Sequence, residues 1–171
     1  MFDQPQAFVL HLQNLAQNNR GALAALRRSA GFAPGAYPPA FPYVERFVSA
    51  DSHAEDSYRQ ALYVTAALFS RHPQHAEGQS LAAALGKLMQ ARDSGSIEQR
   101  FIALLAADAE DLSQYLRQIV SLLAADGYGL DYVSLLQDLS RYLNPFQFEA
   151  RDKVRQRWAR DFYRQLVAQE K

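Results

Sequence analysis

Basic side chains recur near the C-terminal end of the sequence at a spacing that could bind a polyanion. These residues are Lys153, Arg157, Arg160 and Arg164. Intervals of three and four residues place them on one stripe of an α-helix. A separate apolar stripe is formed by Val154, Trp158, Phe162 and Leu166. Such a basic stripe is most often a solvent-exposed helix face. The lack of an interleaved acid makes this one better than average evidence for a phosphate-binding surface.

Further arginines stand at helix positions where two interpretations remain open. Arg27 and Arg28 are adjacent at the end of a short predicted helix. Cations are favoured there by the helix dipole, so the local pattern favours a structural role. Arg100 lies just inside a predicted helix start, where the dipole disfavours a cation. The position of Arg100 is explained either by a function or by a salt bridge, for example to Glu98. Arg117 lies on the polar face of an otherwise apolar helix.

Charge is unevenly distributed although the chain has none overall. The 171 residues contain 18 bases and 18 acids, so net charge gives no case for nucleic-acid binding. The segment 108–138 holds six acids and the single base Arg117, whereas the segment 141–164 holds seven bases and three acids. Arg151 and Arg155 project toward the apolar side of the last helix. We expect them to pair with acids or to lie at the edge of the core.

The residue types used in catalysis and metal binding are not arranged for either. His72 and His75 flank Pro73, which breaks the helical relation between them, and no carboxylate follows at ligand spacing. Glu110 and Asp111 are typical of acids in the first turn of a helix. The sequence contains no glycine-rich phosphate loop, nucleophile elbow or HExxH pattern. We therefore expect no enzymatic activity, no catalytic residues, no metal and no cofactor.

Composition indicates a globular protein that works away from membranes. Apolar residues make up 49% of the chain, which is enough to build a core. The absence of cysteine excludes a disulfide framework and fits a reducing cytosol. The opening residues MFDQPQAF do not resemble a signal peptide, and no apolar run is long enough to span a bilayer. These features predict a cytoplasmic location and no membrane partner.

Apolar spacing is helical almost everywhere, which predicts an all-α fold of about eight or nine helices. Helices are expected at 6–19, 19–31, 52–72, 77–95, 96–107, 108–127, 130–143 and 148–169. Ser52 and Glu55 have the spacing of a capping box for the third helix. The proline-rich segment 32–44 predicts a loop or tight turns. Two packed helical bundles, 1–75 and 76–171, are expected, with a hinge at 71–78.

The order of the local patterns resembles a known family. RGALAALRR is followed by YVTAALFSRHP, LGKLMQARDSGSIEQRFIALLAA, LSQYLRQIVSLL, LDYVSLLQDLSRYL and QRWARDFY. This series is similar to the CasB family, the small subunit of the type I-E CRISPR surveillance complex Cascade. The resemblance covers nearly the whole chain. Each pattern alone is a helix with a basic residue, so order, spacing and length together carry the match.

The resemblance implies a non-catalytic subunit of two helical bundles in prokaryotic antiviral defence. Its partners would be the other Cascade subunits, crRNA, target DNA and a second copy of itself. Basic residues would hold nucleic acid, notably the displaced non-target DNA strand of the R-loop. The family's basic positions correspond to Arg27 and Arg28 in ALRR, Lys87 in LGKLM, Arg100 in EQRF and Arg117 in YLRQ. The stripe on the last helix rests on helical projection alone.

Two other functions remain open at this point. A helical scaffold for protein–protein interaction would need no nucleic acid, and its arginines would pair with the acids of segment 108–138. An all-α hydrolase or metal enzyme would need carboxylates or histidines clustered in a pocket. The neutral net charge departs from the basic character that the resemblance implies.

Overall fold

The computed structural model describes residues 3–53 and 56–167, and within them the fold is all-α, as predicted. Its only extended pairing in these ranges is an isolated bridge between His75 and Leu130. The α-helices are α1 (Gln4–Asn18), α2 (Arg20–Ser29), α3 (Phe41–Val44), α4 (Ser57–Arg71), α5 (Leu81–Arg92), α6 (Gly95–Ala106), α7 (Leu112–Asp126), α8 (Tyr132–Tyr142) and α9 (Phe148–Val167). Two 3-10 helices, η1 (Pro38–Ala40) and η2 (Glu45–Phe47), flank α3. Residues 168 and 169 of the last predicted helix lie outside the described ranges.

Helix α4 begins later than the sequence pattern predicts. The predicted capping residue Ser52 precedes the helix by several residues, and Glu55 lies outside the described part of the chain. The N-cap is instead Asp56, whose carboxylate accepts the backbone N–H of Arg59 at 3.0 Å. Aspartate caps a helix as well as serine does. The prediction of a helix in this segment was therefore correct, but the prediction of a capping box at Ser52 was wrong.

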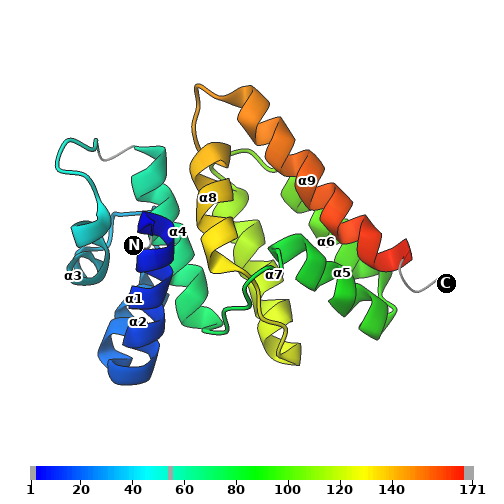
Figure 1. The fold of residues 1–171 in the computed structure, drawn as a ribbon, viewed down its shortest axis with the longest axis horizontal. Helices are drawn as coiled ribbons and strands as arrows, with labels where there is room; N and C mark the ends of the chain where they lie inside the picture. Colours follow the sequence, from blue (N-terminus) through cyan, green and yellow to red (C-terminus); the bar gives the residue numbers. More distant parts are fainter. Residues whose placement is uncertain (1–2, 54–55, 168–171) are drawn as a thin grey trace.

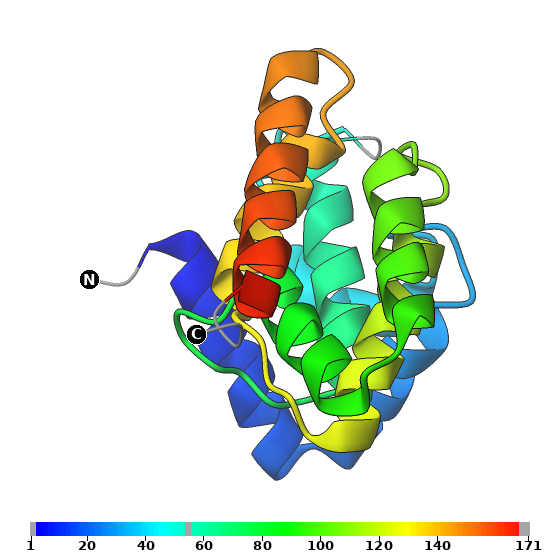
Figure 2. The ribbon, with the colours of Figure 1, turned by 90° about the vertical axis from the view of Figure 1, so that its right-hand side faces the viewer.

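Helix α4 lies at the centre of the molecule (Figure 1). It packs against α2 on the N-terminal side and against α7 and α8 on the other. Every residue from 61 to 70 is buried, because these neighbours cover all sides of the helix. Helices α5, α6 and α9 form the opposite end of the molecule, which Figure 2 views directly, with α9 and α6 upright.

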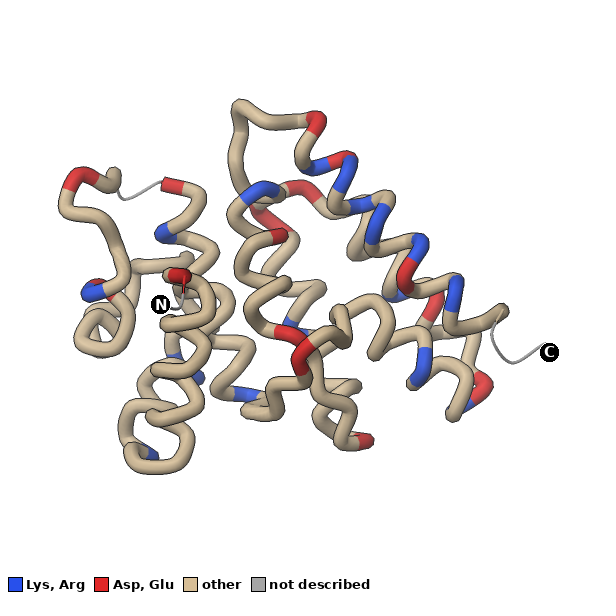
Figure 3. The backbone as a smooth tube through the Cα atoms, viewed as in Figure 1, with Lys and Arg blue, Asp and Glu red and all other residues tan. Residues whose placement is uncertain are grey.

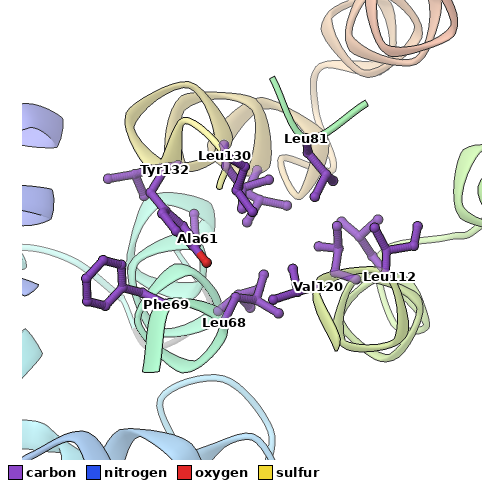
Figure 4. Close-up of a cluster of buried hydrophobic side chains, with 14 of the residues drawn as sticks. Ala61, Leu68, Phe69, Leu81, Leu112, Val120, Leu130 and Tyr132 are labelled. Carbon is purple, nitrogen blue, oxygen red and sulfur yellow. The ribbon is translucent and has the colours of Figure 1, made fainter. Parts of the chain in front are cut away.

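One hydrophobic core runs from the N-terminal helices into the C-terminal ones. Figure 4 shows Leu68 and Phe69 of α4 near Val120 of α7 and Tyr132 of α8. The Phe69 and Tyr132 rings meet edge to face at 5.1 Å between centroids. The helices on both sides of the predicted boundary therefore bury a shared surface. The division at residues 75 and 76 stays a prediction.

The segment predicted as a hinge is tied to the loop that precedes α8. The His72 ring donates its Nε2–H to the Tyr128 carbonyl at 2.6 Å, since a carbonyl can only accept. The Tyr132 hydroxyl donates to the His72 carbonyl at 2.6 Å. His75 accepts the Tyr132 backbone N–H at 3.1 Å. These bonds give His72 and His75 a structural role. They also link the segment after α4 to the segment before α8.

Helix α9 is positioned by a close approach to α5. Val154, Trp158 and Phe162 are buried along one face of α9, as the apolar stripe predicts. The Phe162 ring stacks on Phe101 of α6 at 4.2 Å between centroids. A Cβ on Gly86 of α5 would lie 2.7 Å from the Phe162 carbonyl oxygen, so only glycine permits this approach. The opposite face of α9 is thereby turned outward. No helix in the described ranges is both long and apolar enough to span a membrane.

Candidate nucleic-acid interface

Three helices bring arginines to one groove on the surface. Arg71 ends α4, Arg100 lies in α6 and Arg117 lies in α7. The remaining lining residues are Gln114, Gln118, Ser121 and Leu122. We call this feature the arginine groove. Its lining within the described residues carries three cations, several neutral hydrogen-bonding groups and no acid, which is the chemistry that phosphate groups require.

Hydrogen bonds to neighbouring helices hold this groove in shape. Arg117 donates to the Ala30 carbonyl at the end of α2 at 3.1 Å. Arg71 donates to the Ser121 hydroxyl at 3.4 Å. Arg27 donates to the Ser70 carbonyl at 3.1 Å, next to Arg71 in the chain. Arg27 therefore extends the cationic surface from the groove onto α2.

The predicted arginines of α2 and α6 are exposed. Arg28 lies one residue beyond Arg27, and so projects about 100° further around the helix. Arg100 forms no ion pair with Glu98, and no acid lies within 4.0 Å of its guanidinium among residues 3–53 and 56–167. The salt bridge that would explain Arg100 structurally is therefore not formed with any acid in the described part of the chain.

The outward face of α9 carries a second group of cations. Lys153, Arg160 and Arg164 are exposed, and Figure 3 shows basic positions repeating along the length of this helix. We call Lys153, Arg157, Arg160 and Arg164 the α9 ridge. The helical projection thus places Lys153, Arg160 and Arg164 on an exposed face, and nucleic-acid binding by that face stays a prediction. The ridge and the arginine groove belong to different helices.

Arg157 differs from the other members of the ridge because it contacts a buried carboxylate. Its guanidinium forms an ion pair with Asp138 of α8, which is 5% exposed. The same carboxylate accepts the indole N–H of Trp158 at 2.9 Å and lies 3.7 Å from the Arg141 guanidinium. Arg157 therefore compensates the buried charge of Asp138, which is a structural role. Arg157 is also less exposed to solvent than Lys153.

Arg151 and Arg155 lie at the edge of the core, as predicted. Arg155 donates to the Ala107 carbonyl at 2.9 Å and to the Tyr142 hydroxyl at 3.1 Å. Arg151 donates to the Tyr142 carbonyl at 2.9 Å. Both guanidinium groups lie 5.1 Å from the centre of the Tyr142 ring, so cation–π attraction adds to the hydrogen bonds. These two arginines fasten the start of α9 to α8.

Lys87 stands apart from both groups of cations. Its Nζ donates to the Gln79 side chain at 2.6 Å, over the segment between α4 and α5. Gln79 in turn donates to the Gly129 carbonyl at 2.8 Å. Lys87 is exposed. Its described hydrogen bond is to Gln79, which belongs to neither the arginine groove nor the α9 ridge.

Residues that the sequence patterns did not single out complete these surfaces. Arg71 lines the groove, although a cation in the last turn of a helix is an ordinary capping residue. Arg141, Phe146 and Phe148 border a further pocket with Lys153 at the start of α9. The two phenylalanines lie in and after a short turn, where no helical periodicity marks them.

Internal pairing with acids accounts for only part of the cationic surface. Within the described ranges, the ion pairs to segment 108–138 are those of Arg92 with Asp126 and of Arg141 and Arg157 with Asp138. The Arg92 guanidinium, hydrogen-bonded to Asp126, lowers the pKa of that carboxyl. None of these pairs involves a groove arginine. No group of three histidine or acidic residues in these ranges is placed to hold a metal ion.

Comparison with known proteins identifies the family. The family model described as CRISPR-associated protein Cse2 matches residues 22–163. CRISPR-associated protein Cse2 of Thermus thermophilus is 42% identical over 143 residues, which are 83% of this chain and 78% of that protein. The crystal structure of M. ruber CasB is 33% identical, with a TM-score of 0.80 over 99% of this chain and 98% of that one. A chain of a CRISPR RNA-guided surveillance complex, 24% identical, has the same fold, with a TM-score of 0.81 over 96% and 94% of the two chains. By both sequence and fold, the chain belongs to the CRISPR-associated Cse2 family.

Proposed function

We propose that this protein is the small, non-catalytic subunit of a type I-E Cascade complex and that its cations hold nucleic-acid backbone. The observation that carries this proposal is the arginine groove, in which three helices supply cations to one surface without an acid among its lining residues. The preferred ligand is the displaced non-target DNA strand of the R-loop. Such a strand offers a continuous row of phosphates and needs no base recognition.

Modest binding energy is sufficient for this function. An R-loop exchanges one duplex for another of similar stability, so the equilibrium is nearly balanced. A few contacts between arginines and the displaced strand are then enough to favour the open state. Because phosphates carry no sequence information, these contacts affect how long the R-loop persists and leave the choice of target unchanged.

The partners follow from the family and from the surfaces. A chain of the same fold is part of a CRISPR RNA-guided surveillance complex, which supports association with the other Cascade subunits and crRNA. Target DNA and a second copy of this chain are the further partners that the family resemblance implies. Within the complex, a neutral chain with local basic surfaces avoids indiscriminate binding to free nucleic acid.

The predicted binding residues divide into roles. Arg27, Arg100 and Arg117 contact phosphates together with Arg71 in and beside the groove. Lys153, Arg160 and Arg164 form a second contact along α9. Arg28 and Lys87 are exposed and supply additional charge. Arg157 contributes chiefly by holding α9 on α8, because its guanidinium already compensates Asp138.

The test is retention of target DNA by the assembled complex. A double replacement, Arg71→Glu with Arg100→Glu, should reduce the lifetime of the R-loop roughly tenfold, because two phosphate contacts become repulsive. Neither residue is buried, so the subunit should still fold and assemble. The matched control is Arg46→Glu, an exposed arginine of η2 at the far end of the N-terminal helices. It should leave the lifetime unchanged.

The opposite result would favour the scaffold function. If the complex with the double replacement assembles normally and retains target DNA as long as the parent does, the groove does not bind the displaced strand. The measurement is the dissociation rate of labelled target from immobilised complex, with subunit content checked for each variant.

A further inference from the structure

Two exposed aromatic rings stand at the turn that leads into α9. Phe146 is 90% exposed and Phe148 is 66% exposed, the highest values among the large apolar residues described. They are separated by one residue, with Phe148 beginning the helix. Burial of a phenylalanine is normally favourable, so a pair of rings left in water indicates a surface that a partner covers.

The surroundings of these rings are cationic. Both border a pocket that Arg141, Lys153 and Arg157 also line, with Glu149 as the one acid among the lining residues. The Arg151 guanidinium lies 5.8 Å from the centre of the Phe148 ring, within the range of cation–π attraction. The pocket continues directly into the α9 ridge through Lys153.

Charge complementarity selects the class of partner. An apolar protein surface would desolvate the cations of the pocket, of which Lys153 forms no ion pair within the described residues while Arg141 and Arg157 share Asp138. A single-stranded nucleic acid matches both components, since its phosphates suit the cations and its unpaired bases present flat faces to the rings. The bases of a duplex are already stacked on each other, so they have no free faces on which the phenylalanine rings could stack.

We propose that Phe146 and Phe148 form a stacking platform for unpaired bases of a single strand whose phosphates lie along the α9 ridge. This inference rests on the proposed function and specifies which part of the ligand the turn recognises. Lys153 follows Phe148 by five residues, a rise of about 7.5 Å along the helix. The two side chains project about 140° apart around α9, but both line the same pocket, so a single strand that enters the pocket can contact both.

The test compares a labelled oligothymidylate with an abasic strand of the same length, using the full chain and its variants. The abasic strand keeps the phosphates and removes the bases. The double replacement of Phe146→Ala and Phe148→Ala should weaken binding of the oligothymidylate about tenfold. It should leave the abasic strand and the salt dependence unchanged. Phe146→Tyr keeps an aromatic ring and should bind as the parent does. The control Leu10→Ala removes an exposed apolar side chain from α1 and should have no effect.

The outcomes separate this inference from the function on which it rests. If the parent binds both strands equally, with a strong salt dependence, the phosphate surface stands and the stacking platform is refuted. If the parent binds neither strand, the proposed function fails in the free chain and the platform fails with it. If the double alanine variant binds both strands like the parent but no longer co-purifies with the other subunits, the rings are a protein interface and the proposal is overturned.

Discussion

Replacing Asp138 with alanine is expected to lower the free energy of unfolding by about 3 kcal/mol. The Asp138 carboxylate is buried between α8 and α9, where it accepts the Trp158 indole N–H at 2.9 Å and compensates Arg157. Alanine leaves the buried indole N–H without an acceptor, at a cost of about 1–3 kcal/mol. Arg157 is partly exposed and can turn toward water, which limits its share of the loss. Denaturant unfolding followed by fluorescence measures the change.

A matched control separates this buried carboxylate from a surface one. Asp152 pairs with Arg155 at 3.6 Å on α9, and its side chain is 64% exposed. Asp152→Ala should therefore change stability by less than about 0.5 kcal/mol. Asp138→Asn keeps an acceptor for the indole and should fall between the two. Equal stability of Asp138→Ala and Asp152→Ala would contradict the role assigned to this carboxylate.

The same network decides how nucleic-acid binding can be probed. An Arg157→Glu replacement would place two carboxylates against each other at a buried site and would loosen α9. Loss of binding in that variant would report misfolding as much as a missing phosphate contact. Lys153, Arg160 and Arg164 are exposed on the same face, so they are the appropriate residues to replace.

Gly86→Leu should be the most damaging change at the α5–α9 contact, with a loss of about 2–3 kcal/mol. Its Cβ would meet the Phe162 carbonyl oxygen at 2.7 Å and Gln165 Cβ at 2.9 Å, so the two helices would have to separate. Leucine is a far better helix former than glycine, by almost 1 kcal/mol. Since propensity acts in the opposite direction, any net loss is a lower limit on the cost of the packing clash.

Gly95 provides the comparison for this prediction. It is the first residue of α6, and nothing lies within 4 Å of a Cβ built there. Gly95→Ala should be neutral or slightly stabilising when both variants are compared with the parent by thermal unfolding. A Gly86→Leu protein that melts at or above the parent temperature would show that α9 does not need its close approach to α5.

Helical periodicity predicted the fold because almost every helix here is amphipathic or fully buried. The stripe of Val154, Trp158 and Phe162 was sufficient to orient α9 correctly. The start of α4 was misplaced because several residues before it can cap a helix, and only the folded chain shows that Asp56 does so. Local patterns thus define the elements better than their ends.

The candidate site was predictable in part, for a physical reason. Arg100 was recognisable because it stands where the helix dipole disfavours a cation, and Arg117 because the family resemblance marks its position on a polar helix face. Arg71 was missed because a basic residue in a last turn has an ordinary cause. Arg157 was assigned to the phosphate surface because a projection of one helix cannot reveal Asp138 on another. Sequence patterns within one helix therefore do not predict the contacts that its residues make with other helices.

The most direct test of the phosphate-binding surface is the salt dependence of single-strand binding by the full chain. Fluorescence anisotropy of a labelled strand is measured across a salt series for the parent and for the triple replacement Lys153→Ala, Arg160→Ala and Arg164→Ala. Log affinity should fall with log salt by about 0.7 for each phosphate contact, so losing three contacts should flatten the slope by about 2. A variant with the parent slope, or a parent whose binding does not depend on salt, would contradict the account.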